Sequence, residues 1–322
     1  MGNRERVRYA ILALITTGLT YALIVFGGIV RITGSGMGCG NDWPRCNGSF
    51  IPPINDITTL IEWSHRLAAA LIGFLILGVG LYALKHRSTP ELRDRGILAW
   101  ALVSVGLVLV VVLFGRATVQ LELPPGTVVV HLALASTLLA TLLVSALLAL
   151  SESPGGAPMA DSRLSYPRWA IASATLGFLV LLLGGLTATT GAAPLCTGFP
   201  LCNGQLVPEG GWLVHLHSTH RLMAFALVAV IAFSAVLTVR QGAPARVRRW
   251  ALAALGLVIA QIGVAAAMVL ASLPSGLRAL HLAVAVALWA ALVGWTFLAR
   301  ALPTERAAAA RVSAAPTPAI SA

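Results

Sequence analysis

Long apolar runs separated by short polar segments account for most of the chain. Each run supplies the ~20 residues that an α-helix needs to cross the hydrocarbon core of a bilayer. The pattern therefore predicts an all-α integral membrane protein with eight transmembrane helices. The predicted helices cover residues 9–30, 60–84, 97–119, 127–150, 168–190, 213–239, 250–272 and 277–300.

Composition excludes an ordinary soluble protein. Of 322 residues, 58% are hydrophobic and 10% are charged. The mean hydropathy is +0.87, well above that of a soluble globular domain. The lipid bilayer is thus the expected surroundings of the chain.

The formal net charge of +11 would also suit a protein that binds nucleic acid. Most basic residues, however, lie at the N-terminus, in the second, fourth and sixth connections between the runs, and in the C-terminal tail. The positive-inside rule therefore predicts a plasma-membrane protein with both termini in the cytoplasm. Anionic lipid headgroups account for a basic inner rim, so no nucleic acid partner is expected.

The second half of the chain repeats the first. Four runs make one copy, and because four is even, both copies enter the membrane from the same side. The repeat predicts two tandem parallel four-helix bundles related by a pseudo-twofold axis along the membrane normal. The matched segments are 27–39 with 184–196, 65–67 with 220–222, and 131–133 with 281–283. The predicted organisation is a bundle at 1–150, a cytoplasmic linker at 151–167, a bundle at 168–302 and a disordered cytoplasmic tail at 303–322.

All four cysteines fall in two connections on the outer side of the membrane. Cys39 and Cys46 lie in the first connection, and Cys196 and Cys202 lie in the fifth. Each pair closes a short loop rich in glycine and proline in an oxidising compartment, which predicts two local disulfides. Thiolate ligands of zinc or copper are the alternative, but they favour C-x-x-C spacing with a histidine nearby, and neither loop has these.

Four histidines lie at matched depths inside the predicted helices. His65 and His131 are near the outer ends of the second and fourth runs, and His220 and His281 repeat them in the sixth and eighth. One such histidine can simply hydrogen-bond to a neighbouring helix, but an ionisable residue inside the membrane is costly and marks a functional site by default. Two imidazoles facing each other inside a four-helix bundle are the ligands of a six-coordinate haem, whereas zinc would need further ligands. The repeat thus predicts two haem sites towards the outer face.

Two details of the sixth run affect this assignment. His217 and His220 share a helix face, so either can be the ligand. The repeat favours His220, because Arg221 follows it as Arg66 follows His65. Each arginine either reaches outward to water or binds a haem propionate, to which the planar guanidinium is well suited.

The two halves differ mainly in charge. Glu62 shares a helix face with His65, one turn nearer the outer surface. It is interpreted as a general base or as a charge that stabilises a developing cation; the alternative is a carboxylate that only accepts a hydrogen bond from an interfacial partner. The N-terminal site is therefore predicted to be reactive and the C-terminal site to be a fixed cofactor. The aligned differences are Arg31 with Ala188, Glu62 with His217, Arg116 with Ala266, and Glu122 with Ser272.

These features together resemble the haem A synthases, over residues 9–300. The resemblance rests on the eight runs, the repeat, Glu62-x-x-His65-Arg66, His131, His220-Arg221, His281 and the two outer cysteine pairs. It implies oxidation of the C8 methyl of haem O to a formyl group by successive hydroxylations, giving haem A for terminal oxidases. It further implies that His65 and His131 flank haem O, that His220 and His281 bind a retained haem b, and that Glu62 is the catalytic carboxylate.

The resemblance also implies partners, namely haem O, the haem O synthase that makes it, the assembly of a terminal oxidase, and an electron acceptor that the sequence does not identify. Two other classes match part of the pattern. A di-haem membrane cytochrome b that only transfers electrons has two bis-histidine sites, but usually near opposite membrane faces. A transporter would show broken helices near the midplane and no paired ligands, and the absence of a midplane charge weighs against it.

Overall fold

The computed structural model describes residues 2–53, 55–151 and 164–301, and this part of the chain is helical, with no β-strand. Eight helices are long and apolar enough to cross a membrane, which confirms the predicted fold class. They are α1 (Gly2–Ile32), α2 (Ile57–Lys85), α4 (Ile97–Gln120), α5 (Pro125–Leu150), α6 (Tyr166–Thr189), α7 (Trp212–Arg240), α8 (Ala245–Leu270) and α9 (Ser275–Ala301). The short elements are η1 (Ser35–Met37), α3 (Pro90–Arg93) and η2 (Ala193–Leu195).

The observed helices begin up to seven residues before the predicted runs, because polar residues continue them beyond the apolar stretch. Helix α1, for example, begins at Gly2 and not at residue 9. Helix α6 begins at Tyr166, inside the predicted linker, because Pro167 fits the first turn of a helix. Most of that linker and the whole predicted tail at 303–322 lie outside the described residues.

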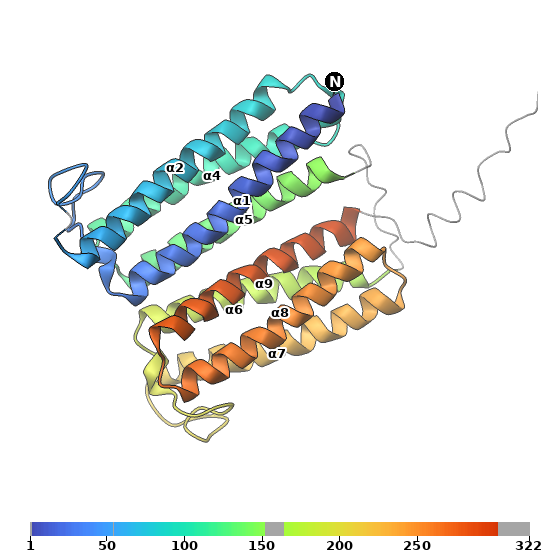
Figure 1. Ribbon diagram of the computed structural model, residues 1–322. Coiled ribbons are helices and arrows are strands. Elements are labelled where there is room, and N and C mark those ends of the chain that lie inside the picture. The colour runs from blue at the N-terminus through green and yellow to red at the C-terminus, as the bar shows by residue number, and fades with distance from the viewer. Residues whose placement is uncertain (1, 54, 152–163, 302–322) are drawn as a thin grey trace, which may run out of the picture.

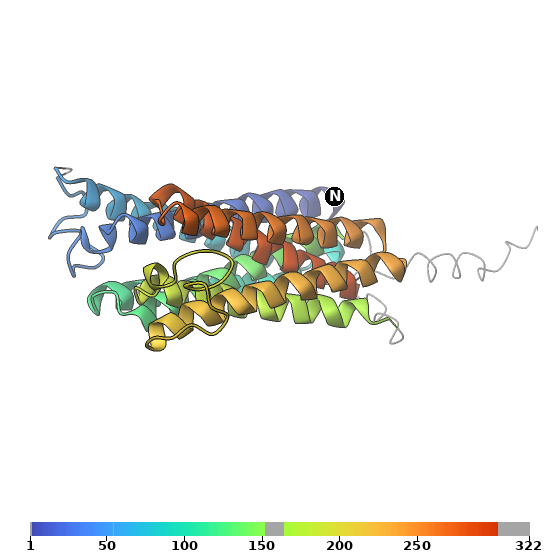
Figure 2. The same ribbon diagram turned by 90° about the horizontal axis from the view of Figure 1, so that it is seen from below.

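The long helices form two groups that lie side by side (Figure 1). Helices α1, α2, α4 and α5 make the first group, and α6 to α9 make the second. In the view turned by 90° the long helices still run along one common direction (Figure 2). The disulfide loops, residues 33–53 and 190–211, lie at the end of the molecule opposite the N-terminus; this is called the loop end below.

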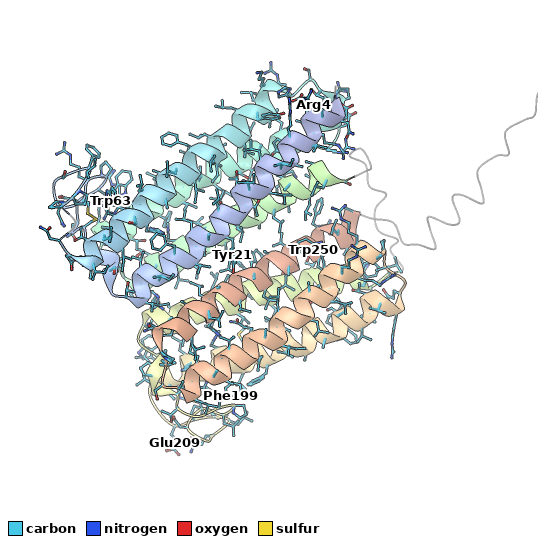
Figure 3. The ribbon with its side chains drawn as sticks, viewed as in Figure 1. Arg4, Tyr21, Trp63, Phe199, Glu209 and Trp250 are labelled. Atoms are coloured by element: carbon cyan, nitrogen blue, oxygen red, sulfur yellow. A yellow bond between two sulfur atoms is a disulfide. The ribbon has the colours of Figure 1, made fainter. Side chains whose placement is uncertain are left out.

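Each bundle has its own apolar core, and a smaller cluster joins them. The first core includes Tyr9 and Val79, and the second includes Ile231 and Trp295, all fully buried. Helices α1, α5, α6 and α9 form the interface between the bundles. Tyr21 lies there (Figure 3), and its hydroxyl donates a hydrogen bond to a backbone carbonyl of α9 at 3.0 Å.

Two glycine–leucine contacts cross this interface reciprocally. Gly28 of α1 packs against Leu282 of α9, and Gly185 of α6 packs against Leu132 of α5. A Cβ atom on Gly185 would lie 3.1 Å from Leu132, and one on Gly28 would overlap Leu282, so glycine allows the helices to approach closely. Since the four residues occupy equivalent positions of the repeat, the contacts are consistent with the predicted pseudo-twofold axis.

Candidate functional site

The structure brings the predicted histidine pairs together, one pair in each bundle. His65 and His220 each lie eight residues into their helices, α2 and α7, while His131 and His281 each lie six residues into α5 and α9. At 1.5 Å per residue these positions are about 12 Å and about 9 Å from the loop end of the helices. The imidazoles of each pair are close enough to interact electrostatically, His65 with His131 and His220 with His281.

Glycines of neighbouring helices make room for three of the four imidazoles. A Cβ atom at any of these glycines would come within 3.1 Å of a ring atom. A larger residue would therefore displace the ring. The pairs are Gly27 with His65, Gly115 with His131, and Gly184 with His220.

The arrangement fits a haem in each bundle. The Nδ1 atoms of His131 and His220 are buried and have no hydrogen-bond partner within the described residues. Over the same residues, no three side chains of His, Cys, Asp or Glu form a group that could hold a metal ion. Paired imidazoles suit the two axial positions of a haem iron, whereas a zinc site requires more ligands in one place.

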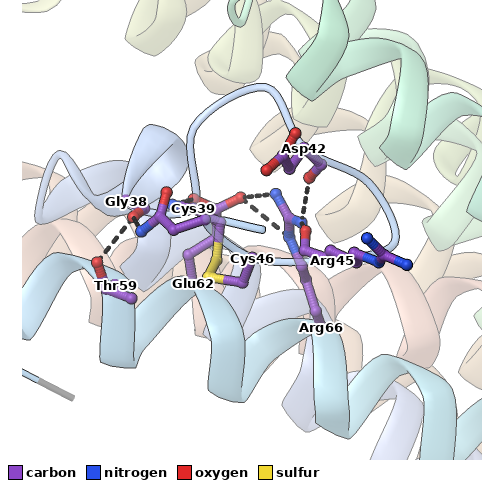
Figure 4. Close-up of polar contacts among 9 residues, drawn as sticks. Gly38, Cys39, Asp42, Arg45, Cys46, Thr59, Glu62 and Arg66 are labelled. Carbon is purple, nitrogen blue, oxygen red and sulfur yellow. Dashed lines mark hydrogen bonds and ion pairs between the residues drawn. A yellow bond between two sulfur atoms is a disulfide. The ribbon is translucent and has the colours of Figure 1, made fainter. Parts of the chain in front are cut away.

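Glu62 is tied to the first disulfide loop (Figure 4). The side chain is only 3% exposed, and its Oε2 accepts a hydrogen bond from the backbone N–H of Cys39 at 2.9 Å. Its Oε1 accepts from Nε of Arg66 at 3.1 Å and forms an ion pair with the same guanidinium. Nη1 of Arg66 also donates to the backbone carbonyls of Asp42 and Arg45, at 2.7 and 2.8 Å. One guanidinium thus joins the carboxylate to the loop.

Arg221 holds the second disulfide loop in the same way. Its Nη1 donates to the backbone carbonyls of Gly198 and Leu201, both at 2.8 Å, which are the equivalent positions of the repeat. Its Nη2 donates to the carbonyl of Cys196 at 2.6 Å, and its Nε donates to Nε2 of His217 at 3.2 Å. Because His217 is engaged by Arg221, His220 is the member of the α7 pair that remains available as a ligand.

Both predicted disulfides are present, Cys39–Cys46 and Cys196–Cys202. The propionate role of Arg66 and Arg221 stays a prediction, because the structure shows these guanidiniums bound to the loops. The sequence held no signal for these contacts, since the acceptors are backbone carbonyls, which any residue type provides.

The other charges specific to the N-terminal half lie around the loop end of its bundle. Arg31 donates to a backbone carbonyl of α6 at 2.9 Å, across the bundle interface. The Arg116 guanidinium stacks over the Trp43 ring of the first disulfide loop, 5.6 Å from its centroid. Glu122 is exposed in the turn between α4 and α5 and accepts a hydrogen bond from an asparagine of the same loop at 3.4 Å.

One site residue was missed by the sequence analysis. Gln261 of α8 places its amide nitrogen 3.1 Å from Nδ1 and 3.2 Å from Nε2 of His281. The repeat contains the signal, because the offset of 150 that matches His131 with His281 also matches Val111 with Gln261. Gln261 is a neutral amide, so it does not stand out among the differences in charge between the two halves.

Fold and site together define a class: an eight-span membrane protein with a duplicated bundle and one buried histidine pair in each half. The chain belongs to a family described as COX15-CtaA, cytochrome oxidase assembly protein, whose sequence model matches residues 10–293. It is 30% identical over 293 residues to a heme A synthase of Symbiobacterium thermophilum, covering 87% of this chain and 92% of that one. It is 31% identical over 240 residues to a heme A synthase of Bacillus licheniformis, covering 71% and 75% of the two chains.

A further relative carries a different name. The chain is 31% identical over 274 residues to a protoheme IX farnesyltransferase of Thermus thermophilus. The match covers 82% of this chain but only 44% of that protein. More than half of the Thermus protein therefore lies outside the region that is similar to this chain.

Proposed function

We propose that this chain is a haem A synthase that oxidises the C8 methyl group of haem O to a formyl group. The observation that carries the proposal is the combination of two matched histidine pairs with a buried carboxylate, Glu62, in only one half. The heme A synthases among its relatives support the same activity. The oxidation takes four electrons from the substrate, by two successive hydroxylations of the methyl and loss of water.

The two bundles have different roles in this proposal. Residues 1–150 form the catalytic bundle, in which His65 and His131 flank the substrate haem O. Residues 168–302 form the second bundle, in which His220 and His281 bind haem b as the resident cofactor. Haem b, when bound, supplies one-electron redox chemistry. The glycines that pack against three of the rings and the unpartnered ring nitrogens of His131 and His220 support this assignment.

Glu62 is the proposed catalytic carboxylate. Its position three residues before His65 on α2 places it on the ligand's face of the helix. Arg66 and the Cys39 amide hold the carboxylate in one orientation, so its negative charge has a fixed place beside the site. A carboxylate that is fixed and paired in this way is better suited to stabilising a cation that develops at the oxidised carbon than to acting as a general base that must move. In this proposal the first disulfide loop orients Glu62.

The orientation in the plasma membrane follows from the distribution of arginine. The end that carries Arg4 lies opposite the disulfide loops (Figure 3). We place that end and both termini in the cytoplasm and the two haem sites towards the outer face. All four imidazoles then lie nearer one face, which argues against a cytochrome b that only passes electrons across the membrane.

The proposed partners are the haem O synthase and the terminal oxidase that receives haem A. The Thermus relative supports the first, because a region similar to this chain there belongs to a longer protein named for farnesyl transfer. The family description supports the second. The acceptor of the electrons is a further partner, of unassigned identity.

Pigment extraction tests the activity. The chain is expressed together with a source of haem O, purified from membranes, and its haems are extracted and separated by mass. We expect haem A, or haem O with a hydroxylated C8 methyl, beside haem B. A preparation that contains haem B alone, with haem O supplied, would overturn the proposal in favour of the electron-transferring cytochrome.

A further inference from the structure

Helix α8 faces His281 in the C-terminal bundle, and α4 faces His131 in the N-terminal bundle. At one matched position α8 has a polar residue and α4 has an apolar one. In the C-terminal bundle, α8 presents Gln261 to His281, and the amide nitrogen also donates to the backbone carbonyl of His281 at 3.0 Å. In the N-terminal bundle, α4 has Val111 at the equivalent position. His131 there faces the backbone carbonyl of Val111, while its Nδ1 is buried without a hydrogen-bond partner within the described residues.

We propose that Gln261 is a positioning residue that fixes the imidazole of His281, so that the C-terminal pair retains its haem while the N-terminal pair can exchange haem. The inference rests on the proposed function in one respect, the assignment of a resident haem to His220 and His281. The presence of Gln261 in only one bundle is a chemical reason why two sites built on the same repeat would bind haem with different affinity.

The chemistry of an axial histidine supports this role. When one ring nitrogen binds iron, the other carries a proton and needs an acceptor, which orients the ring and makes it a stronger ligand. The Oε1 atom of Gln261 is a buried acceptor with no hydrogen-bond partner in the described part of the chain. A half-turn of the amide exchanges its oxygen and nitrogen. It would bring Oε1 to the place that now lies 3.1 Å from Nδ1 and 3.2 Å from Nε2 of His281, and it would give up the 3.0 Å hydrogen bond to the His281 backbone carbonyl in exchange for one from the ring.

Valine cannot act in this way, because its side chain has no polar atom. His131 also packs against Gly115, whereas the equivalent position in α8 is Ala265. The ring of His131 therefore has more room, and its acceptor on α4 is the backbone carbonyl of Val111 and not a side chain. Both differences favour a looser histidine in the bundle whose haem must enter as substrate and leave as product.

Reciprocal variants test the proposal, with Gln261→Val and Val111→Gln each placing the other half's residue at the matched position. For the Gln261 variants three properties of the purified protein are measured: haem b content, the rate at which haem b passes to apomyoglobin, and the midpoint potential of haem b. For Val111→Gln the haem O content is measured as well. For Gln261→Val we expect weaker haem b binding, by about 10- to 100-fold, and a higher midpoint potential, because the imidazole loses its acceptor. For Val111→Gln we expect more haem O to copurify with the chain.

The variant Gln261→Glu separates a specific role from a general packing defect. It keeps the side-chain length and an acceptor oxygen, so we expect haem b to be retained and its midpoint potential to shift downward. The proposal is overturned if Gln261→Val leaves both the transfer rate and the potential unchanged. It is also overturned if Gln261→Glu and Gln261→Val shift the potential in the same direction.

Failure of this inference can be told apart from failure of the proposed function. All three readouts concern haem b and do not require haem A to be formed. If pigment extraction yields haem B alone while the potential still responds to Gln261, the activity is wrong and the positioning role stands. If haem A is formed and the potential does not respond, the reverse holds.

Discussion

The second helix of each bundle, α2 and α7, carries an arginine that ties the adjoining disulfide loop to the helix. Arg66 and Arg221 each donate to two backbone carbonyls of their own loop, and these carbonyls occupy equivalent positions of the repeat. In this respect the halves are alike. They differ four residues earlier, where the arginine meets the carboxylate of Glu62 in one half and the imidazole of His217 in the other. A duplicated chain thus keeps the contacts that hold its loops and changes the residues beside its histidine pairs.

The strongest test of the comparison removes a ligand from one half. His220→Ala and His281→Ala should each eliminate bound haem b, because a bis-histidine site loses half of its axial ligands. Absorption spectra of the purified variants measure this, with haem O binding by the N-terminal pair retained. His215→Ala serves as the control, since that histidine is exposed and outside the pair. Unchanged haem b content in both ligand variants would show that the site lies elsewhere.

The next test concerns the residue that is charged in one half only. Glu62→Gln keeps the size and the hydrogen-bonding capacity of the side chain but removes its charge. We expect haem b to stay bound and haem A formation to fall by about 10²- to 10³-fold, the usual loss when one preorganised group that stabilises a developing charge is removed. The matched control His217→Gln should leave the rate within a few-fold. A normal rate in Glu62→Gln would make Glu62 a loop anchor only and move attention to Glu122.

A smaller difference is expected in stability. Arg66→Ala leaves the buried carboxylate of Glu62 without its counter-charge, which typically costs about 3–5 kcal/mol. Arg221→Ala leaves a neutral imidazole in the same place and should lower the free energy of unfolding less. Thermal unfolding in detergent measures both. The double variant Glu62→Gln with Arg66→Ala should recover part of the loss. Equal Tm values for Arg66→Ala and Arg221→Ala would contradict a larger contribution of the Glu62–Arg66 ion pair to stability.

The smallest effect concerns the helix starts. Asp56 caps α2 by accepting from the Thr59 amide, whereas Gly211 begins α7 without a side-chain cap. The Thr58 hydroxyl and the Thr59 amide hold the pKa of the Asp56 carboxyl below its ordinary value. Its contribution to stability is therefore present above that ordinary value and is lost as the pH falls through the lowered one.

Asp56→Ala should accordingly lower Tm slightly at neutral pH and make no difference in strong acid. Thermal unfolding of the variant and the natural chain across this pH range measures the difference. Gly211→Ala, at the uncapped start of α7, is the matched control and should give a pH profile parallel to that of the natural chain. A difference at Asp56 that persists unchanged in strong acid would exclude a contribution from the charge of the cap.

The spans and the pairing of the histidines could be predicted from the sequence because both depend on local composition and on the repeat. His65 and His220 fall at the same depth of α2 and α7, as matched segments require. The sequence did not predict the arginine contacts, whose acceptors are backbone carbonyls placed by the folding of the loops. Nor did it predict the place of Gln261, whose proximity to His281 depends on how α8 rotates against α9. Such rotation is set by packing over many residues and leaves no short motif.

The crossed contacts of Gly28 with Leu282 and of Gly185 with Leu132 have a consequence for how the two units fit together. Each four-helix unit carries both a notch at the glycine and a leucine that fits the notch of another unit. A surface of this kind is self-complementary, as in an isologous dimer. In a single unit of this sequence both features would be exposed. In this chain each notch is filled by the leucine of the other unit, so the two copies cover each other although they differ beside the histidine pairs.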